Sequence, residues 1–323
     1  MADISRQARS SVPARPGVKR GSAAGGPGSY KGKPERPGGT GTRSRSAARA
    51  RRRRSKLAVG AGLVVLAMVA ALAIAYAGGG AGPPVATGAS ASGTYAVAPA
   101  TLRPLENVPA AALKEAATSS PKAAQPPMAL PLSAAALSSG GKPEVLYIGA
   151  NYCPYCAAER WALLSALSKF GTFSALRGTA SSETDGVNPG TPTVTFAGSV
   201  YRSSYLDFVA VETQGSVAGP DGKYPLRDKM SSAQSALFSK YDSSPYVPPG
   251  EAGGIPFLDL GGRYYFVGSQ YDASHIAGWD FDRAAAYLAT GSNPTSVTMR
   301  AAAGQLVDDM CRLTGAQPKA SCP

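Results

Sequence analysis

Two cysteines separated by two residues constrain the fold of this chain more than any other feature. Cys153 and Cys156 follow a short apolar run at 145–149, which is typical of a buried strand. After them, large apolar residues recur at helical spacing from 163 to 170, and Gly171 then follows as a helix stop. The sequence therefore predicts a strand, then the cysteine pair, then a helix that begins at or near Cys153.

A cysteine pair at the start of a helix is suited to thiol chemistry. Unpaired backbone N–H groups and the helix dipole favour an anion there, so the Cys153 thiolate is stabilised and becomes nucleophilic near neutral pH. Cys156 lies one turn further on and can attack a mixed disulfide formed by Cys153. We predict that Cys153 attacks and Cys156 resolves, with Pro154 and Tyr155 contacting the substrate.

Other uses of this pair are open. A permanent structural disulfide is one alternative, although so short a ring is usually strained and reducible. A Cys₄ zinc site is another, but Cys311 and Cys322 are separated by ten residues, which is poor ligand spacing. His275 is the only histidine and is expected on the surface. We therefore expect no metal and no cofactor.

Cys311 and Cys322 lie at the C-terminal end of the chain. In an oxidising compartment the simplest interpretation is a structural disulfide that ties the last segment to the final helix. Closing so short a loop contributes on the order of 2–3 kcal/mol. The alternative is a second redox pair that passes electrons to Cys153 and Cys156.

The rest of the folded part is predicted to contain both strands and helices. The apolar patterns predict a short helix at 109–117, strands at 191–198 and 205–212, helices at 231–241, 281–289 and 296–313, and a hairpin around Gly261 and Gly262. The fold class is therefore mixed α/β.

Three stretches, 141–173, 253–268 and 310–322, resemble the family called domain of unknown function 929. The resemblance covers roughly 102–322. It implies a thioredoxin-like fold, with a long insertion between the motif helix and a cis-proline hairpin, and an N-terminal membrane anchor. Because the activity of that family is itself inferred, the resemblance supports the fold more than a substrate.

A thioredoxin-like fold needs a cis-proline that faces the cysteines. Thr191-Pro192 and Ile255-Pro256 both precede a predicted strand. Only Pro256 is followed by a hairpin and then by a helix, which is the thioredoxin order. We therefore favour Pro256, with the Ile255 backbone pairing with an extended substrate.

The sequence departs from thioredoxin at one position. Thioredoxin carries a buried carboxylate six residues before its first cysteine, and Tyr147 stands there in this chain. A proton relay would have to come from elsewhere, such as Glu159 or water. For Glu159 we favour another role, as an exposed salt-bridge partner on the helix surface.

The net charge of +13 is concentrated before the folded part. Residues 1–56 carry 16 of the 33 Lys and Arg and only two of the 20 acids. This tail has few large apolar residues and is expected to be disordered. The remainder has a net charge of −1, so we expect no nucleic-acid partner, with RNA or DNA binding by the tail as an alternative.

Residues 57–77 are uncharged and contain no proline. As a helix they would span about 31 Å, which matches a hydrocarbon core of roughly 30 Å. The preceding arginines predict a cytoplasmic N-terminus. A cleaved signal peptide is the alternative, although its apolar region is usually only about 7–15 residues long. A flexible linker at 78–101 and an extracytoplasmic thioredoxin-like domain at 102–323 are expected to follow.

These inferences combine into one functional prediction. We expect a cell-membrane, single-pass thiol–disulfide oxidoreductase acting on extracytoplasmic proteins that carry thiols or disulfides, with a membrane redox partner that recycles it. The alternative is a non-enzymatic extracytoplasmic binding module held together by structural disulfides. The two differ in whether Cys153 is a reactive thiolate.

Overall fold

The computed structural model describes residues 93–184, 186–248 and 250–322. The chain divides into two units, Met1–Gly80 and Ala81–Pro323, and all the described residues belong to the second. The expected tail at 1–56, the expected membrane helix at 57–77 and most of the expected linker at 78–101 lie outside the described residues. Among the helices of residues 93–322 that are described, none is long and apolar enough to cross a membrane.

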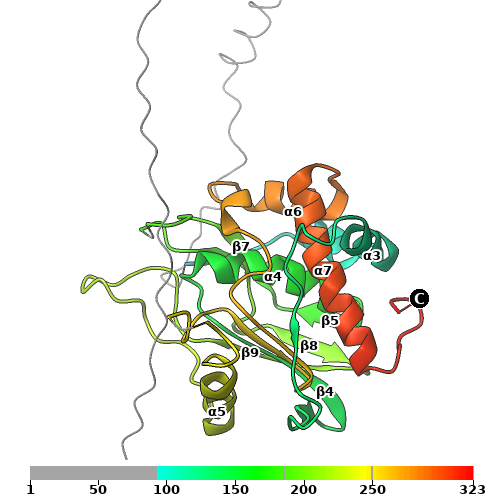
Figure 1. The fold of residues 1–323 in the computed structure, drawn as a ribbon. Helices are drawn as coiled ribbons and strands as arrows, with labels where there is room; N and C mark the ends of the chain where they lie inside the picture. The colour runs from blue at the N-terminus through cyan, green and yellow to red at the C-terminus, as the bar shows by residue number, and fades with distance from the viewer. Residues whose placement is uncertain (1–92, 185, 249, 323) are drawn as a thin grey trace, which may run out of the picture. The chain divides into compact units, whose positions relative to one another are not determined.

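The centre of the domain is a mixed sheet built around β4 (Lys142–Gly149) (Figure 1). On one side β4 pairs in parallel with β9 (Asp207–Glu212), and on the other it pairs antiparallel with β10 (Phe257–Leu260). The sheet continues through β11 (Tyr264–Val267) to β2 (Met128–Ala129), and β3 (Ser138–Ser139) pairs with the start of β4.

Both faces of β4 are covered, which explains its continuous apolar sequence. Successive side chains of a strand point to opposite faces. Val145 and Tyr147 accordingly pack into one hydrophobic cluster, and Leu146 and Ile148 pack into another. The four side chains are at most 1 % exposed. If the pairing register of β4 shifted by one residue, each side chain would stay buried but would move to the opposite hydrophobic cluster.

The helices lie on either side of this sheet. The first cluster joins the sheet to α4 (Pro154–Leu167) and α7 (Pro294–Leu313), and the second joins it to α5 (Ser232–Tyr241). Three further elements complete the α4 side: α2 (Pro99–Glu106), α3 (Ala110–Ser119) and α6 (Phe281–Thr290). A short 3₁₀ turn, η1 (Ala273–His275), precedes α6.

Two small antiparallel sheets lie beside the central one. One has the order β1 (Thr94–Ala96), β6 (Arg177–Ala180), β7 (Pro192–Thr195), and the other pairs β5 (Gly171–Ser174) with β8 (Val200–Ser203). Because β1 is paired and α2 begins at Pro99, the last part of the expected linker at 78–101 belongs to the folded domain. Gly171 begins a strand rather than ending a helix, since α4 already ends at Leu167.

The prediction of a mixed α/β domain is confirmed, as are the strand before the cysteine pair and the helix after it. The expected hairpin is formed by β10 and β11. The peptide bond Ile255–Pro256 is cis, and Thr191–Pro192 is not among the cis bonds of the described chain. The long segment between α4 and the hairpin is more than an insertion, because it supplies β9, the parallel neighbour of β4.

Helices α3 and α7 approach each other closely at Gly304, in the middle of α7. A side-chain carbon added at Gly304 would collide with the backbone carbonyl oxygen of Leu113 on α3. A carbonyl in a helix cannot move aside without breaking its own hydrogen bond. The glycine is therefore a packing requirement, even though glycine is unfavourable inside a helix.

We predict that Gly304→Ala destabilises the domain by about 1–3 kcal/mol, because overpacking against backbone outweighs a gain of about 1 kcal/mol in helix propensity. Chemical denaturation measures the change. Gly186→Ala is the matched control: open space surrounds position 186, so its effect should stay within about 0.5 kcal/mol. A more stable Gly304→Ala variant would contradict the packing argument.

Candidate functional site

Cys153 is the N-cap residue of α4. Its backbone is extended, and its sulfur accepts a hydrogen bond from the backbone N–H of Cys156 at 3.3 Å. Pro154 occupies the first helical turn, where its missing N–H costs nothing. The sequence prediction that the helix begins at Cys153 is thereby confirmed. The sulfur lies where the unpaired N–H groups of a helix favour negative charge.

The two cysteines differ in their access to solvent. Cys156 is fully buried, Cys153 is 5 % exposed, and Tyr155 between them is 41 % exposed. Both cysteines are free thiols in the described part of the chain. Of the pair, only Cys153 can be approached from outside, which agrees with its expected role as the attacking thiol.

The cis-proline segment faces the cysteines, as the sequence predicted. The Cys153 thiol donates a hydrogen bond of 3.6 Å to the carbonyl oxygen of Ile255, although the two residues are 102 positions apart in the chain. Ile255 is half-buried and Pro256 is buried at the start of β10. The predicted residues 153–156 and 255–256 therefore meet at one place.

The surroundings separate the pKa values of the two thiols. The hydrogen bond from the Cys156 side chain is the main influence that lowers the pKa of Cys153, and the backbone N–H groups of Cys156 and Tyr155 and the charge of Arg160 act in the same direction against burial. Burial, together with the interaction with Cys153, raises the pKa of Cys156 well above its ordinary value. Cys153 is thus the thiol that ionises first.

Backbone hydrogen bonds hold the loop that carries Cys153. The carbonyl of Gly149 accepts from the N–H and the hydroxyl of Thr213, at 2.8 and 2.9 Å. Asn151 donates its N–H to the carbonyl of Gln214 at 2.9 Å. The segment that follows β9 thereby fixes the position of the cysteine loop.

An aromatic stack fixes the next residue. The rings of Tyr152 and Tyr224 lie 4.4 Å apart and nearly parallel. The Tyr224 hydroxyl donates a hydrogen bond of 2.7 Å to the Ser182 hydroxyl, and the Ser182 N–H donates to the carbonyl of Tyr152 at 2.9 Å. Segments around 182 and 224 thus hold Tyr152, the residue directly before the cysteine pair.

A buried ion pair lies beneath the cysteine loop, and sequence reasoning missed it. Arg160 on α4 donates two hydrogen bonds to Glu212 at the end of β9, at 2.8 and 2.6 Å, and both side chains are fully buried. Arg160 also donates to the carbonyl of Ala150 at 2.8 Å. A signal was present, because Arg160 stands beside Glu159 in a largely apolar helix and Glu212 ends a largely apolar strand.

Glu159 is not an exposed salt-bridge partner, and that expectation was wrong. Its side chain is fully buried because α4 is covered on all sides. One carboxylate oxygen accepts a hydrogen bond of 2.9 Å from the N–H of Gln270, after β11. The other has no partner within the described residues. Burial raises the pKa of Glu159 to about 8, and the proton relay stays an untested alternative for this residue.

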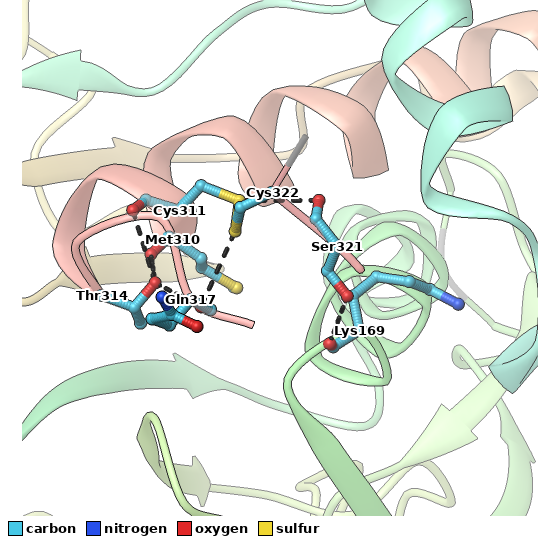
Figure 2. The surroundings of a disulfide bond; sticks show 7 residues. All are labelled: Lys169, Met310, Cys311, Thr314, Gln317, Ser321 and Cys322. Atoms are coloured by element: carbon cyan, nitrogen blue, oxygen red, sulfur yellow. Dashed lines mark hydrogen bonds between the residues drawn. A yellow bond between two sulfur atoms is a disulfide. The ribbon is translucent and has the colours of Figure 1, made fainter. Parts of the chain in front are cut away.

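The second cysteine pair forms the expected disulfide between Cys311 and Cys322 (Figure 2). It ties the C-terminal segment to α7. The Ser321 hydroxyl also donates a hydrogen bond of 2.7 Å to the carbonyl of Lys169, just beyond the end of α4. Since α4 has 14 residues, this end is about 20 Å from its N-terminus. The structure therefore does not bring this pair to Cys153.

The remaining sequence candidates are accounted for. His275 is exposed in η1, as expected. Within 93–322 as described, no group of three or more His, Cys, Asp or Glu is arranged to hold a metal ion. Tyr147 is fully buried beneath the cysteine loop, where its hydroxyl packs against Gly149.

Fold and site define a mixed α/β domain with a closely spaced pair of thiols at the N-terminus of its central helix. The chain belongs to the family described as Domain of unknown function (DUF929), whose model matches residues 129–311. This match includes both Cys153 and the cis-proline hairpin. Neither the curated proteins nor the solved structures contain a match to the chain.

The buried carboxyl of Glu159 predicts a pH-dependent stability. Its pKa is about 8 in the folded protein and about 4.3 in an unfolded chain. Between these values the unfolded state has lost the proton and the folded state keeps it, so stability falls as the pH rises. Relative to Glu159→Gln, the wild-type protein should lose on the order of 3–5 kcal/mol between pH 4.5 and 8.

Denaturation of both proteins across that pH range measures the difference. The buried carboxyls of Asp259 and Asp309, whose pKa values are also raised, to about 6 and about 7, are common to both proteins and cancel. Parallel stability profiles would show that Glu159 is ionised in the folded state.

A second prediction concerns the disulfide. The double variant Cys311→Ala, Cys322→Ala should be less stable by about 2–3 kcal/mol, because the unfolded chain regains loop entropy. Its Cys153 should react with an alkylating reagent at the wild-type rate, since the bond lies at the far end of α4. A changed alkylation rate would contradict the structure, because it would show that the disulfide affects Cys153 from the far end of α4.

Proposed function

We propose that this domain catalyses thiol–disulfide exchange, with Cys153 as the attacking and Cys156 as the resolving cysteine. One observation carries the proposal: the Cys153 sulfur caps the N-terminus of α4 and at the same time faces the carbonyl of Ile255 before a cis-proline. A thiolate is favoured there, and the Ile255 backbone lies beside it, where an extended substrate chain would pair with it.

The topology supports a thioredoxin-like fold. The described chain contains, in order, strand β4, helix α4, parallel strand β9, helix α5, the hairpin β10–β11 and helix α7. The sheet places β4 between β9 and β10, with β11 outside β10. This is the order expected for such a fold, and strands β5 to β8 are then the insertion that follows the motif helix.

The chemistry follows from the different environments of the two thiols. The Cys153 thiolate attacks one sulfur of a partner disulfide; a bond from Cys153 to that sulfur forms, the partner bond breaks, and the released thiolate takes up a proton. Cys156 stays protonated until then, because burial raises its pKa. After losing its proton it attacks Cys153, forms the Cys153–Cys156 disulfide and releases the reduced partner.

We further propose that the domain works on the outer side of a membrane. The uncharged stretch at 57–77 and the arginines before it favour a single-pass anchor with a cytoplasmic N-terminus. The Cys311–Cys322 disulfide fits an oxidising compartment. The partners are then extracytoplasmic proteins with thiols or disulfides, and a membrane redox protein that restores the cysteine pair.

Redox titration of the full chain in glutathione buffers tests this function. Free thiols are trapped and located by mass spectrometry at each potential. We expect Cys153 and Cys156 to titrate together between about −120 and −270 mV, the span of known exchange proteins, while Cys311 and Cys322 stay oxidised. A pair that resists reduction below about −300 mV would be structural, and the domain would then be a binding module.

Single-cysteine variants test the assigned roles. Cys156→Ser should accumulate a mixed disulfide through Cys153, because the resolving thiol is missing. Cys153→Ser should form none, because the buried Cys156 cannot be reached. Equal trapping by both variants would contradict the roles given to the two residues.

A further inference from the structure

The guanidinium of Arg160 is buried next to the loop that carries Cys153. Cys156 and Arg160 are four residues apart on α4, so their side chains lie on the same face of the helix, and both are fully buried. Arg160 donates a hydrogen bond to the carbonyl of Ala150 at 2.8 Å, and the N–H of Cys153 bonds to the same carbonyl at 3.3 Å. The cation is thus attached to the loop that carries the attacking sulfur.

One nitrogen of this guanidinium is left over. Glu212 accepts from Nε and Nη2, whereas Nη1 has no hydrogen-bond partner among the described residues. The Tyr147 hydroxyl, buried beside it, likewise has none in the described chain. A buried cation with an unused donor is costly unless further negative charge comes close.

Such negative charge arises at the cysteines. The charge of Arg160 lowers the pKa values of Cys153 and Cys156 and so stabilises their ionised forms. Glu212 is the negative charge to which Arg160 is already bound. Glu212 acts in the opposite sense, because a carboxylate at the same place offsets the cation. The pKa values of the two thiols therefore depend on both charges of the ion pair.

We propose that Arg160 is a positioning residue that stabilises the thiolate of the exchange site, and that Glu212 is the counter-charge that limits this effect. The proposal rests on the proposed exchange function. It assigns the redox properties of the pair to a charge below the cysteines as well as to the helix N-terminus. It also assigns the position of the cysteine loop to the bond between Arg160 and Ala150.

The two charges predict shifts of opposite sign. In Arg160→Met the Cys153 thiolate loses its neighbouring cation, so the pKa of Cys153 should rise and less thiolate is present at a pH below that pKa. The remaining thiolate is more nucleophilic, which offsets part of the loss. The alkylation rate of Cys153 should therefore fall at least about threefold. The reduction potential should become more negative. In Glu212→Gln the cation is no longer offset, so the rate should rise and the potential should become less negative.

The opposite signs of the two expected rate changes distinguish an electrostatic role of the ion pair from a purely structural one. Both variants break the same buried ion pair and loosen the same loop, so a purely structural role would move both rates in one direction. Arg160→Lys keeps the charge without the two-pronged geometry, and its rate should stay within about twofold of the wild type. Arg283→Met, on an exposed position of α6, removes an equal charge elsewhere and should change nothing.

The measurements are made on the full chain, by timed alkylation and mass spectrometry, and by equilibration with glutathione. Unchanged rates in Arg160→Met, or shifts of the same sign in Arg160→Met and Glu212→Gln, would overturn the proposal. If Arg160→Met does not fold, the sign of the shift in Glu212→Gln decides. A failure of the exchange function is distinguishable, because the wild-type pair would then resist reduction altogether.

Discussion

The ion pair between Arg160 and Glu212 is the interaction on which the arrangement of the site depends. It joins the central helix to the end of β9, and through Ala150 it joins both to the loop after β4. The loop and the helix are neighbours in the sequence, whereas Glu212 lies 52 residues beyond Arg160. Removing one member of such a fully buried pair leaves an uncompensated charge and costs about 3–5 kcal/mol, so the pair fixes the geometry of the loop as well as its electrostatics.

Much of the fold could be predicted from the sequence, because its strongest signals are local. The apolar run before Cys153, the spacing of the motif helix and the glycine turn of the hairpin each depend on neighbouring residues alone. The choice of Pro256 as the cis-proline followed from the order of elements along the chain. Of the small sheets only β7 was predicted; β5 and β6 were missed because their sequences, GTFS and RGTA, contain no apolar run of the kind that marks β7, β10 and β11.

The site was predicted only in part, and the reason is physical. The cysteine pair and the cis-proline are marked by residue type and by position relative to predicted elements. The charges beneath them are not. Glu159 was expected to be exposed because helices of small domains usually have one exposed face, and Arg160 was not considered at all. Here α7, α2, η1, β7 and the central sheet surround α4, and only tertiary structure shows that a charged residue is inside.

The limited exposure of Cys153 has a consequence for the kind of client that the site accepts. A sulfur that is 5 % exposed and hydrogen-bonded to the carbonyl of Ile255 is recessed from the surface. A disulfide held flat on a rigid globular face cannot reach it. Under the exchange function proposed above, a client would therefore have to present its disulfide on a flexible segment of chain that can enter the recess.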